Sequence, residues 1–178
     1  AAYPSGTCEA CFEWELYRAQ FLFAQISTLE DSLQHLLTLE TTLEQLRERY
    51  PRTFQRGRTH LQQGEANLRM GYFDDALMEF ARAEALLGDS DEGDVARLQK
   101  AMCAFYGGDI PWAKTQLEVL LQSTSKSIAN DALESALMIS ANSVEDTLME
   151  GLQLIREPML LEAQGKTAAA IEKYKALK

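Results

Sequence analysis

The hydrophobic and polar positions along this chain follow the 3.6-residue period of the α-helix. Within Gly71–Leu87, GYFDDALMEFARAEALL, the spacings of four, three and four place Ala76, Phe80, Ala83 and Leu87 on one helix face. Glycine (10) and proline (4) are scarce among the 178 residues, so few turns are signalled. The pattern predicts an all-α protein.

Helices are expected near 11–34, 37–50, 57–70, 74–87, 94–107, 111–122, 127–141, 144–157, 158–164 and 167–177. Two alternatives stay open for the first two. The absence of Gly and Pro from 12 to 50 favours one long helix, whereas S/T-x-x-E boxes at Ser27 and Thr41 favour breaks. Pro158 is expected to kink a helix or to begin a new one, because proline lacks the N–H and clashes with the preceding turn.

A short apolar motif returns along the chain. Its two positions, four residues apart, are Ala76 and Phe80, Ala113 and Leu117, Ala170 and Tyr174, and in degenerate form Leu39 and Leu43. A glycine stands five residues before each alanine, namely Gly71, Gly108 and Gly165, where the left-handed conformation that ends a helix is expected. Twelve residues before two of the alanines stand Gly64 and Ala101, whose small size would let paired helices approach closely.

These features resemble the tetratricopeptide repeat, which is a repeated pair of antiparallel helices. The resemblance covers 57–122 and extends to 151–178 and to 20–51, which RERYP closes with Pro51. His60, Gln63 and Asn67 replace the usual Trp, Leu and Tyr. The second half is similar to bacterial repeat proteins of unassigned role. The resemblance implies a right-handed superhelix, with a tail at 1–10, an N-terminal helical hairpin at 11–56, and a repeat domain at 57–178 with an extra helix near 127–141.

In this family the first helix of each pair lines a concave groove that binds protein segments. The groove positions, carried over residue by residue, fall on Arg58, Leu61, Glu65, Leu68, Arg69, Val95, Leu98, Met102, Phe105 and Tyr106. The set is largely apolar, with methionine and aromatic side chains, which favours an amphipathic helix or an apolar strand as the ligand. Leu61 and Glu65 stand where the family's clamp for acidic chaperone tails uses polar or basic residues, so that partner is not expected.

Charge and hydropathy narrow the partners. The 17 basic and 27 acidic residues leave a net charge of −10, which disfavours nucleic acid and anionic lipid. No apolar run approaches the roughly 20 residues of a membrane-spanning helix. The chain begins with Ala-Ala, as expected of a processed chain or one with added residues. Because some of the similar bacterial proteins are exported, an extracytoplasmic site is expected.

Chemistry-bearing motifs are few. Cys8 and Cys11 form a lone C-x-x-C, open to a redox pair, half a zinc site, or a local bond in an oxidising compartment. The loop GDSDEGD at 88–94 is rich in carboxylates but departs from the EF-hand pattern, so a solvated loop is favoured over calcium. No nucleophile elbow or phosphate loop occurs. We therefore expect no enzyme activity, no cofactor and no metal.

The last helix predicts a second contact surface. It presents Ile171, Tyr174 and Leu177 with no following helix to cover them. Either its one apolar face is already packed, or the sequence is part of a longer array, or the face docks on a partner or a second copy; the last two are favoured. The sequence thus predicts a non-catalytic scaffold or adapter that binds protein segments. The alternative is a structural subunit of a homo-oligomer, or of a larger membrane-associated assembly, that docks through this helix.

Overall fold

The computed structural model describes residues 8–24, 32–123, 126–141 and 150–177. These segments form α1 (Glu9–Ala24), α2 (Ser32–Arg49), α3 (Thr53–Met70), α4 (Phe73–Leu87), α5 (Asp91–Gly107), α6 (Ile110–Ser123), α7 (Lys126–Ala141), α8 (Glu150–Ala163) and α9 (Thr167–Ala176). No strand occurs in the described segments. The prediction of an all-α protein is therefore confirmed.

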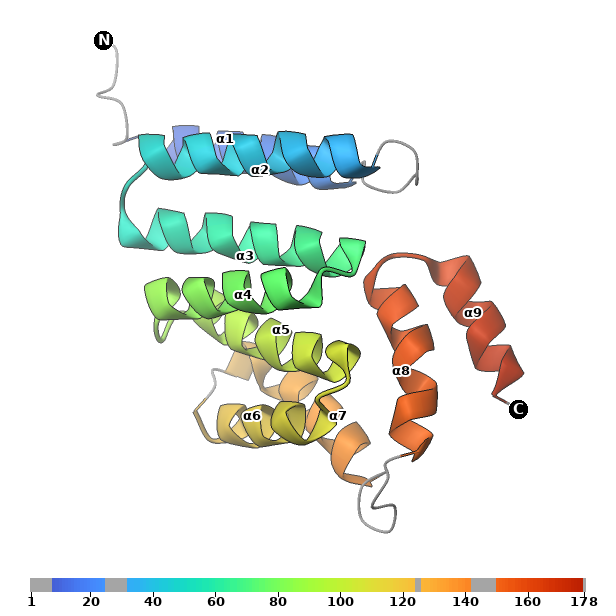
Figure 1. Cartoon of the computed structure of the whole chain (residues 1–178). Helices are drawn as coiled ribbons and strands as arrows, with labels where there is room; N and C mark the ends of the chain where they lie inside the picture. The colour runs from blue at the N-terminus through green and yellow to red at the C-terminus, as the bar shows by residue number, and fades with distance from the viewer. Residues whose placement is uncertain (1–7, 25–31, 124–125, 142–149, 178) are drawn as a thin grey trace.

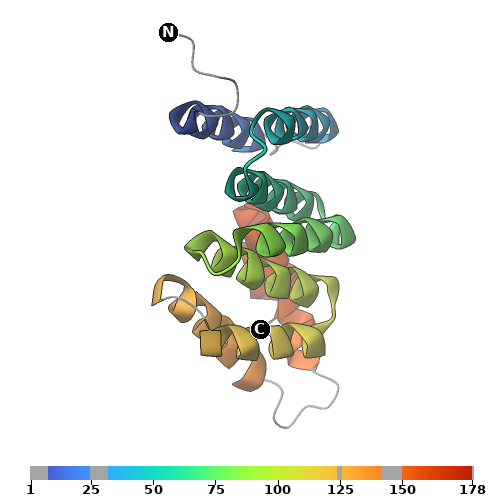
Figure 2. The same cartoon turned by 90° about the vertical axis from the view of Figure 1, so that its left-hand side faces the viewer.

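The helices are stacked in the order of the chain. From α1 to α7 each helix packs against the next, and the odd-numbered helices α1, α3, α5 and α7 also contact one another in series. Figure 1 shows the pair α1–α2 at the top, α3–α4 beneath it, and α5, α6 and α7 below. Figure 2 shows the same order from a second direction. The odd-numbered helices therefore make up one layer of the stack.

Several helix boundaries differ from those expected. Helix α1 begins at Glu9, inside the segment predicted as a tail, and α3 begins at Thr53 rather than at residue 57. Residues 25–31, where the first break was in question, lie outside the described residues, but α1 and α2 are separate elements on either side of them. Helix α8 runs through Pro158, so the two helices predicted around this proline form one. Residues 144–149 of the predicted pair also lie outside the described residues.

The predicted glycine helix ends are confirmed. Gly71, Gly108 and Gly165 have φ values of 83°, 101° and 75°, in the left-handed region that glycine adopts without strain. At Gly71 the backbone N–H donates to Leu68 O at 3.0 Å, and the following N–H, of Tyr72, donates to Asn67 O at 2.9 Å. These bonds satisfy the last carbonyls of α3 and turn the chain directly into α4.

Close packing of small against large residues holds α3 and α4 together. The Phe80 ring is fully buried, and it lies so near Gly64 that a Cβ there would come within 2.6 Å of Phe80 Cε1. Ala76 and Ala83, on the same face of α4, are also completely buried. The small residue expected at position 64 therefore does allow the two helices to approach closely.

The last helix pair leaves the stacking order. Figure 1 shows α8 running along the stack, beside one end of the preceding helices. It packs against α5, with Leu152 buried and Ile155 and Met159 against the core of α5, α6 and α7. Leu160 packs with the residues around Phe80. The layer of odd-numbered helices is thereby partly covered by the chain's own α8.

Replacing Gly64 by valine is expected to lower the free energy of unfolding by about 2–3 kcal/mol, because the added carbons must displace a buried ring. The matched control is Gly151→Val, since a side chain at this helical glycine meets nothing within 4 Å. The control should change stability by no more than about 0.5 kcal/mol. Urea denaturation of both variants measures the difference. Equal effects would show that the Gly64–Phe80 contact is not limiting.

Candidate functional site

A cavity of about 460 Å³ lies on the layer of odd-numbered helices, where α8 crosses it. Side chains from α1, α3, α5, α7 and α8 line it, namely Phe23, Glu65, Leu68, Arg69, Leu98, Gln99, Met102, Tyr106, Ser135, Met159, Glu162 and Ala163. This volume falls within the range of about 300–1,000 Å³ that is usual for ligand sites in proteins. We treat the cavity as the candidate site.

The floor of the cavity is apolar. Leu68, Leu98 and Met102 are only 5–9% exposed, and Phe23 from α1 is 8% exposed. Methionine side chains adapt their shape to different apolar partners. The floor therefore suits an apolar side chain, without demanding one particular shape.

Two carboxylates from different helices line the cavity. Glu65 on α3 is partly buried, and Glu162 on α8 is exposed. Burial raises the pKa of Glu65 to about 7, and the nearby charge of Arg69 lowers it only in part. Burial also raises the pKa of Tyr106 to about 12, with the charge of Glu162 adding to the effect. A basic side chain that entered the cavity would meet the carboxyl groups of Glu65 and Glu162, which could pair with its charge.

Arg69 is the basic residue of the cavity lining, and it already has partners. Its guanidinium carbon lies 3.9 Å from the centroid of the Phe23 ring. A planar guanidinium over an aromatic face is held by cation–π attraction. This contact ties the end of α1 to α3 and closes one side of the cavity.

The structure brings together six of the predicted groove residues at this cavity: Glu65, Leu68, Arg69, Leu98, Met102 and Tyr106. Val95 is partly buried against the core of α5, α6 and α7, and Leu61 packs between α3 and α4. Phe105 is completely buried, so it belongs to the core and not to an open surface. Arg58 is engaged by α1, through an ion pair with Glu13.

Six residues of the lining were missed from the sequence: Phe23, Gln99, Ser135, Met159, Glu162 and Ala163. Gln99 had a signal, because it stands three residues before Met102 and seven before Tyr106 on the same helix face. The contributions of α8 had none, since they depend on where a later helix docks. The same is true of Phe23, which comes from the hairpin that precedes the predicted groove.

The three residues predicted on the last helix, Ile171, Tyr174 and Leu177, are 47%, 36% and 41% exposed. The Tyr174 hydroxyl donates to Glu162 Oε2 at 3.3 Å. The C-terminal face therefore lies close to the cavity rim, although it does not line the cavity.

One histidine has a carboxylate partner that the sequence did not indicate. His60 Nδ1 lies 2.6 Å from Glu79 Oε2, between α3 and α4, and both side chains are about 11–12% exposed. Burial raises the pKa of Glu79, but the hydrogen bond and charge of His60, with Arg82 and Arg47, lower it overall. The ionised carboxylate therefore stabilises the fold at pH above its unfolded pKa, and this contribution is lost as pH falls. The pair acts as a structural contact between helices.

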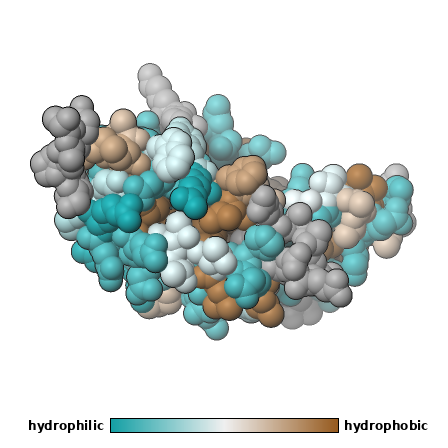
Figure 3. All heavy atoms as spheres, turned by 90° about the horizontal axis from the view of Figure 1, so that it is seen from above, coloured by the Kyte–Doolittle hydropathy of each residue, from teal (hydrophilic) through white to brown (hydrophobic). Residues whose placement is uncertain are grey.

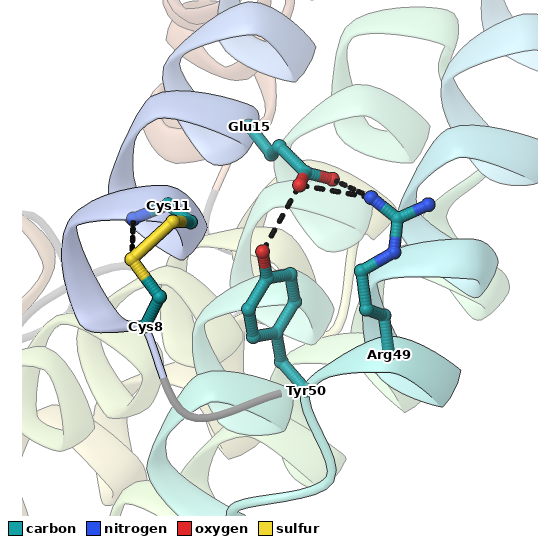
Figure 4. The surroundings of a disulfide bond; sticks show 5 residues. All are labelled: Cys8, Cys11, Glu15, Arg49 and Tyr50. Carbon is teal, nitrogen blue, oxygen red and sulfur yellow. Dashed lines mark hydrogen bonds and ion pairs between the residues drawn. A yellow bond between two sulfur atoms is a disulfide. The ribbon is translucent and has the colours of Figure 1, made fainter. Parts of the chain in front are cut away.

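Cys8 and Cys11 form a disulfide at the start of α1 (Figure 4). The two sulfurs are bonded to each other, so in this state neither is a thiolate ligand for zinc. Close by, Glu15 accepts hydrogen bonds from Arg49 at 2.7 Å and from the Tyr50 hydroxyl at 3.0 Å (Figure 4). Burial and the Glu15 carboxylate raise the pKa of Tyr50. This cluster fixes α1 against the end of α2.

The segment at 88–94, predicted as a solvated loop, leads directly into α5, which begins at Asp91, and Asp94 is buried. Ser90 caps the helix by accepting from Gly93 N at 3.1 Å, and Asp91, Glu92 and Asp94 fall in the first turn. Arg97 pairs with Asp94 at 2.7 Å and with Asp89 at 3.1 Å. Across the described residues, no cluster of three or more His, Cys, Asp or Glu side chains is placed to hold a metal ion.

Comparison of the chain with protein-family models, with curated proteins and with solved structures gave no match. None of the described helices is both long enough and apolar enough to cross a membrane.

Replacing Glu65 by glutamine is expected to change stability in a pH-dependent manner. The folded-state pKa of about 7 exceeds the ordinary value of 4.5, so the native protein loses stability as pH rises from about 4.5 through 7. Glutamine removes this loss. At pH 8 the variant should be more stable than the parent by up to about 3 kcal/mol, and below pH 4 the two should be nearly equal. Denaturation at both pH values tests this, and a pH-independent difference would contradict it.

Proposed function

We propose that this protein is a non-catalytic scaffold or adapter, of the tetratricopeptide-like type, that binds protein segments at the cavity between α3, α5 and α8. The observation that carries the proposal is the cavity itself, with its apolar floor and its two carboxylates. The serial contacts of the odd-numbered helices support a repeat of helix pairs, since the first helices of successive pairs would form such a layer. The glycine helix ends support it as well.

Helix α8 gives an indication of what this layer binds. One face of α8 carries Leu152, Ile155 and Met159 at the spacing of an amphipathic helix. This face packs against the core of α5, α6 and α7. Because α8 covers part of the predicted groove, a bound protein segment would lie across the remaining opening. Its side chains would enter the cavity. We infer a ligand with one or two apolar side chains for the floor.

The carboxylates specify the rest of the ligand. Ionised Glu65 is costly in its partly buried place, and a lysine or arginine side chain in the cavity would offset that cost. Glu162, which lines the cavity from α8, would form the second contact. The proposed partner is therefore an apolar protein segment that carries a basic residue, in contrast to an acidic tail.

A bulky residue in the cavity should block binding. Ala163 is exposed and lines the cavity from α8, so Ala163→Trp fills the opening without disturbing the core. Ala168→Trp is the matched control, because Ala168 is exposed on α9 and is not among the lining residues. Peptides selected on the parent protein from a random display library should bind Ala163→Trp at least about tenfold more weakly and Ala168→Trp unchanged. Peptides that bind both variants equally would reject the cavity as the site.

The charge preference is tested separately by Glu162→Lys. Selected peptides that contain a lysine or arginine should lose about three- to tenfold in affinity, because a favourable exposed charge pair becomes a repulsive one. Glu118→Lys, an exposed position on α6, provides the same charge change away from the cavity. Titration calorimetry at low and high salt measures both variants. Equal losses would assign the effect to overall charge.

The C-terminal face is a second candidate docking surface. Its three apolar residues stay partly exposed in the structure, which favours a partner there. Because these side chains are only partly exposed, the apolar area that they offer to a partner is reduced. Tyr174 also already donates a hydrogen bond to Glu162. The cavity therefore remains the better supported site.

A further inference from the structure

Helix α1 carries two apolar faces. The first packs into the protein and consists of Phe12, Leu16, Ala19 and Phe23, all buried. The second, which we call the aromatic stripe, consists of Trp14, Tyr17 and Phe21 at spacings of three and four, and each is 65% exposed. At 3.6 residues per turn the stripe lies about half a turn around the helix from the buried face. It therefore points directly away from the core.

The stripe lies on the outermost pair of the stack. Figures 1 and 2 show α1 and α2 side by side at one end, with α3 beneath them. Figure 3, which looks down on that end, shows hydrophobic and intermediate side chains between hydrophilic ones. On α2, Leu33 and Leu37 are also 57% and 56% exposed. Helix α1 packs mainly against α2 and α3, towards which its buried face is turned.

The size of the stripe matches that of the largest apolar patch on a typical monomer, which is often functional. An aromatic side chain has about 150–250 Å² to bury, so three of them at 65% exposure offer roughly 300–500 Å². A standard interface buries about 800 Å² on each partner, so the stripe supplies about half of one side.

We propose that the aromatic stripe is a self-association surface, on which α1 of a second copy packs in the antiparallel direction about a two-fold axis. The stripe is about 10 Å long and has Tyr17 near its middle. A two-fold axis there places Trp14 opposite Phe21 of the other copy, and Tyr17 opposite its own equivalent. Offset and edge-on pairing of such rings is favourable. The surface therefore complements itself.

The charges around the stripe permit this pairing. None of its three members is charged, and Arg18 lies at its edge. The neighbouring acids are already neutralised within the protein, Glu13 by Arg58 and Glu15 by Arg49. Anionic lipid is the less suitable occupant, because it would present a continuous negative surface to a chain of net charge −10, whereas a second copy presents the uncharged stripe itself. The self-association is independent of ligand binding at the cavity.

Molar mass in solution tests the proposal. Sedimentation or light scattering over a wide concentration range should show the 20.0 kDa chain passing from monomer to dimer. Tyr17→Glu should weaken dimerisation by at least about tenfold, because it places like charges at the centre of the interface. Tyr174→Glu, the same change on the C-terminal face, should leave the dimer intact. Circular dichroism should show both variants folded, since neither tyrosine is buried.

A second measurement tests the geometry. In Tyr17→Cys the new thiol is exposed, whereas Cys8 and Cys11 are bonded to each other and Cys103 is buried. Mild oxidation should therefore link two copies through position 17, and Tyr174→Cys should not be linked at comparable yield. A monomer at every concentration would overturn the proposal. So would a dimer lost only in Tyr174→Glu, or binding to phosphatidylcholine vesicles that Tyr17→Glu abolishes.

Discussion

The close packing of α3 against α4, with the ring of Phe80 over Gly64, is the contact on which the rest of the stack depends. At Gly64 the backbone of α3 lies directly against the Phe80 ring of α4, because glycine has no side chain. This contact fixes the separation and the lateral position of the two helices. Further along the same face of α4, Ala83 and Leu87 form a small cluster with Ala96 of α5. As a result α3 and α5 lie next to each other in one layer, and their outer faces meet at the cavity.

A polar layer accompanies this apolar contact. Gln55, Gln63 and Asn67 on α3 are buried, and Gln63 donates to Glu40 of α2 at 3.2 Å. His60, three residues before Gln63 on the same helix, pairs with Glu79 of α4. Within the described part of the chain, the Oε1 atoms of Gln55 and Gln63 are buried without a hydrogen-bond partner. The Gln63–Glu40 and His60–Glu79 contacts, which a shift along the helix axis would break, favour one alignment of α2, α3 and α4. We interpret this layer as a source of specificity for the stack, with the apolar cores supplying most of the stability.

The docking of α8 converts one face of the stack into a site. Without α8, the outer faces of α3 and α5 would form an open apolar surface. With it, α8 contributes Met159, Glu162 and Ala163 to the lining, so that carboxylates from both α3 and α8 line the cavity. Gln164 donates to the carbonyl oxygen of Leu68 at 3.4 Å, which anchors the end of α8 at the end of α3. The cavity and the C-terminal face are also connected at α8, because the Tyr174 hydroxyl donates to Glu162 of the lining.

The sequence by itself determined the local features. Helical periodicity predicted the all-α class, and glycine predicted the helix ends at Gly71, Gly108 and Gly165. The resemblance to the tetratricopeptide repeat, carried over position by position, predicted six residues of the cavity lining. All of these depend on residues within a few turns of one another. Only the tertiary structure decided the burial of Phe105, the continuity of α8 through Pro158, and the contributions of Phe23 and Glu162 to the cavity. These features depend on long-range packing. An apolar helix face gains the free energy of burial whichever distant helix covers it, so the local pattern does not specify that helix.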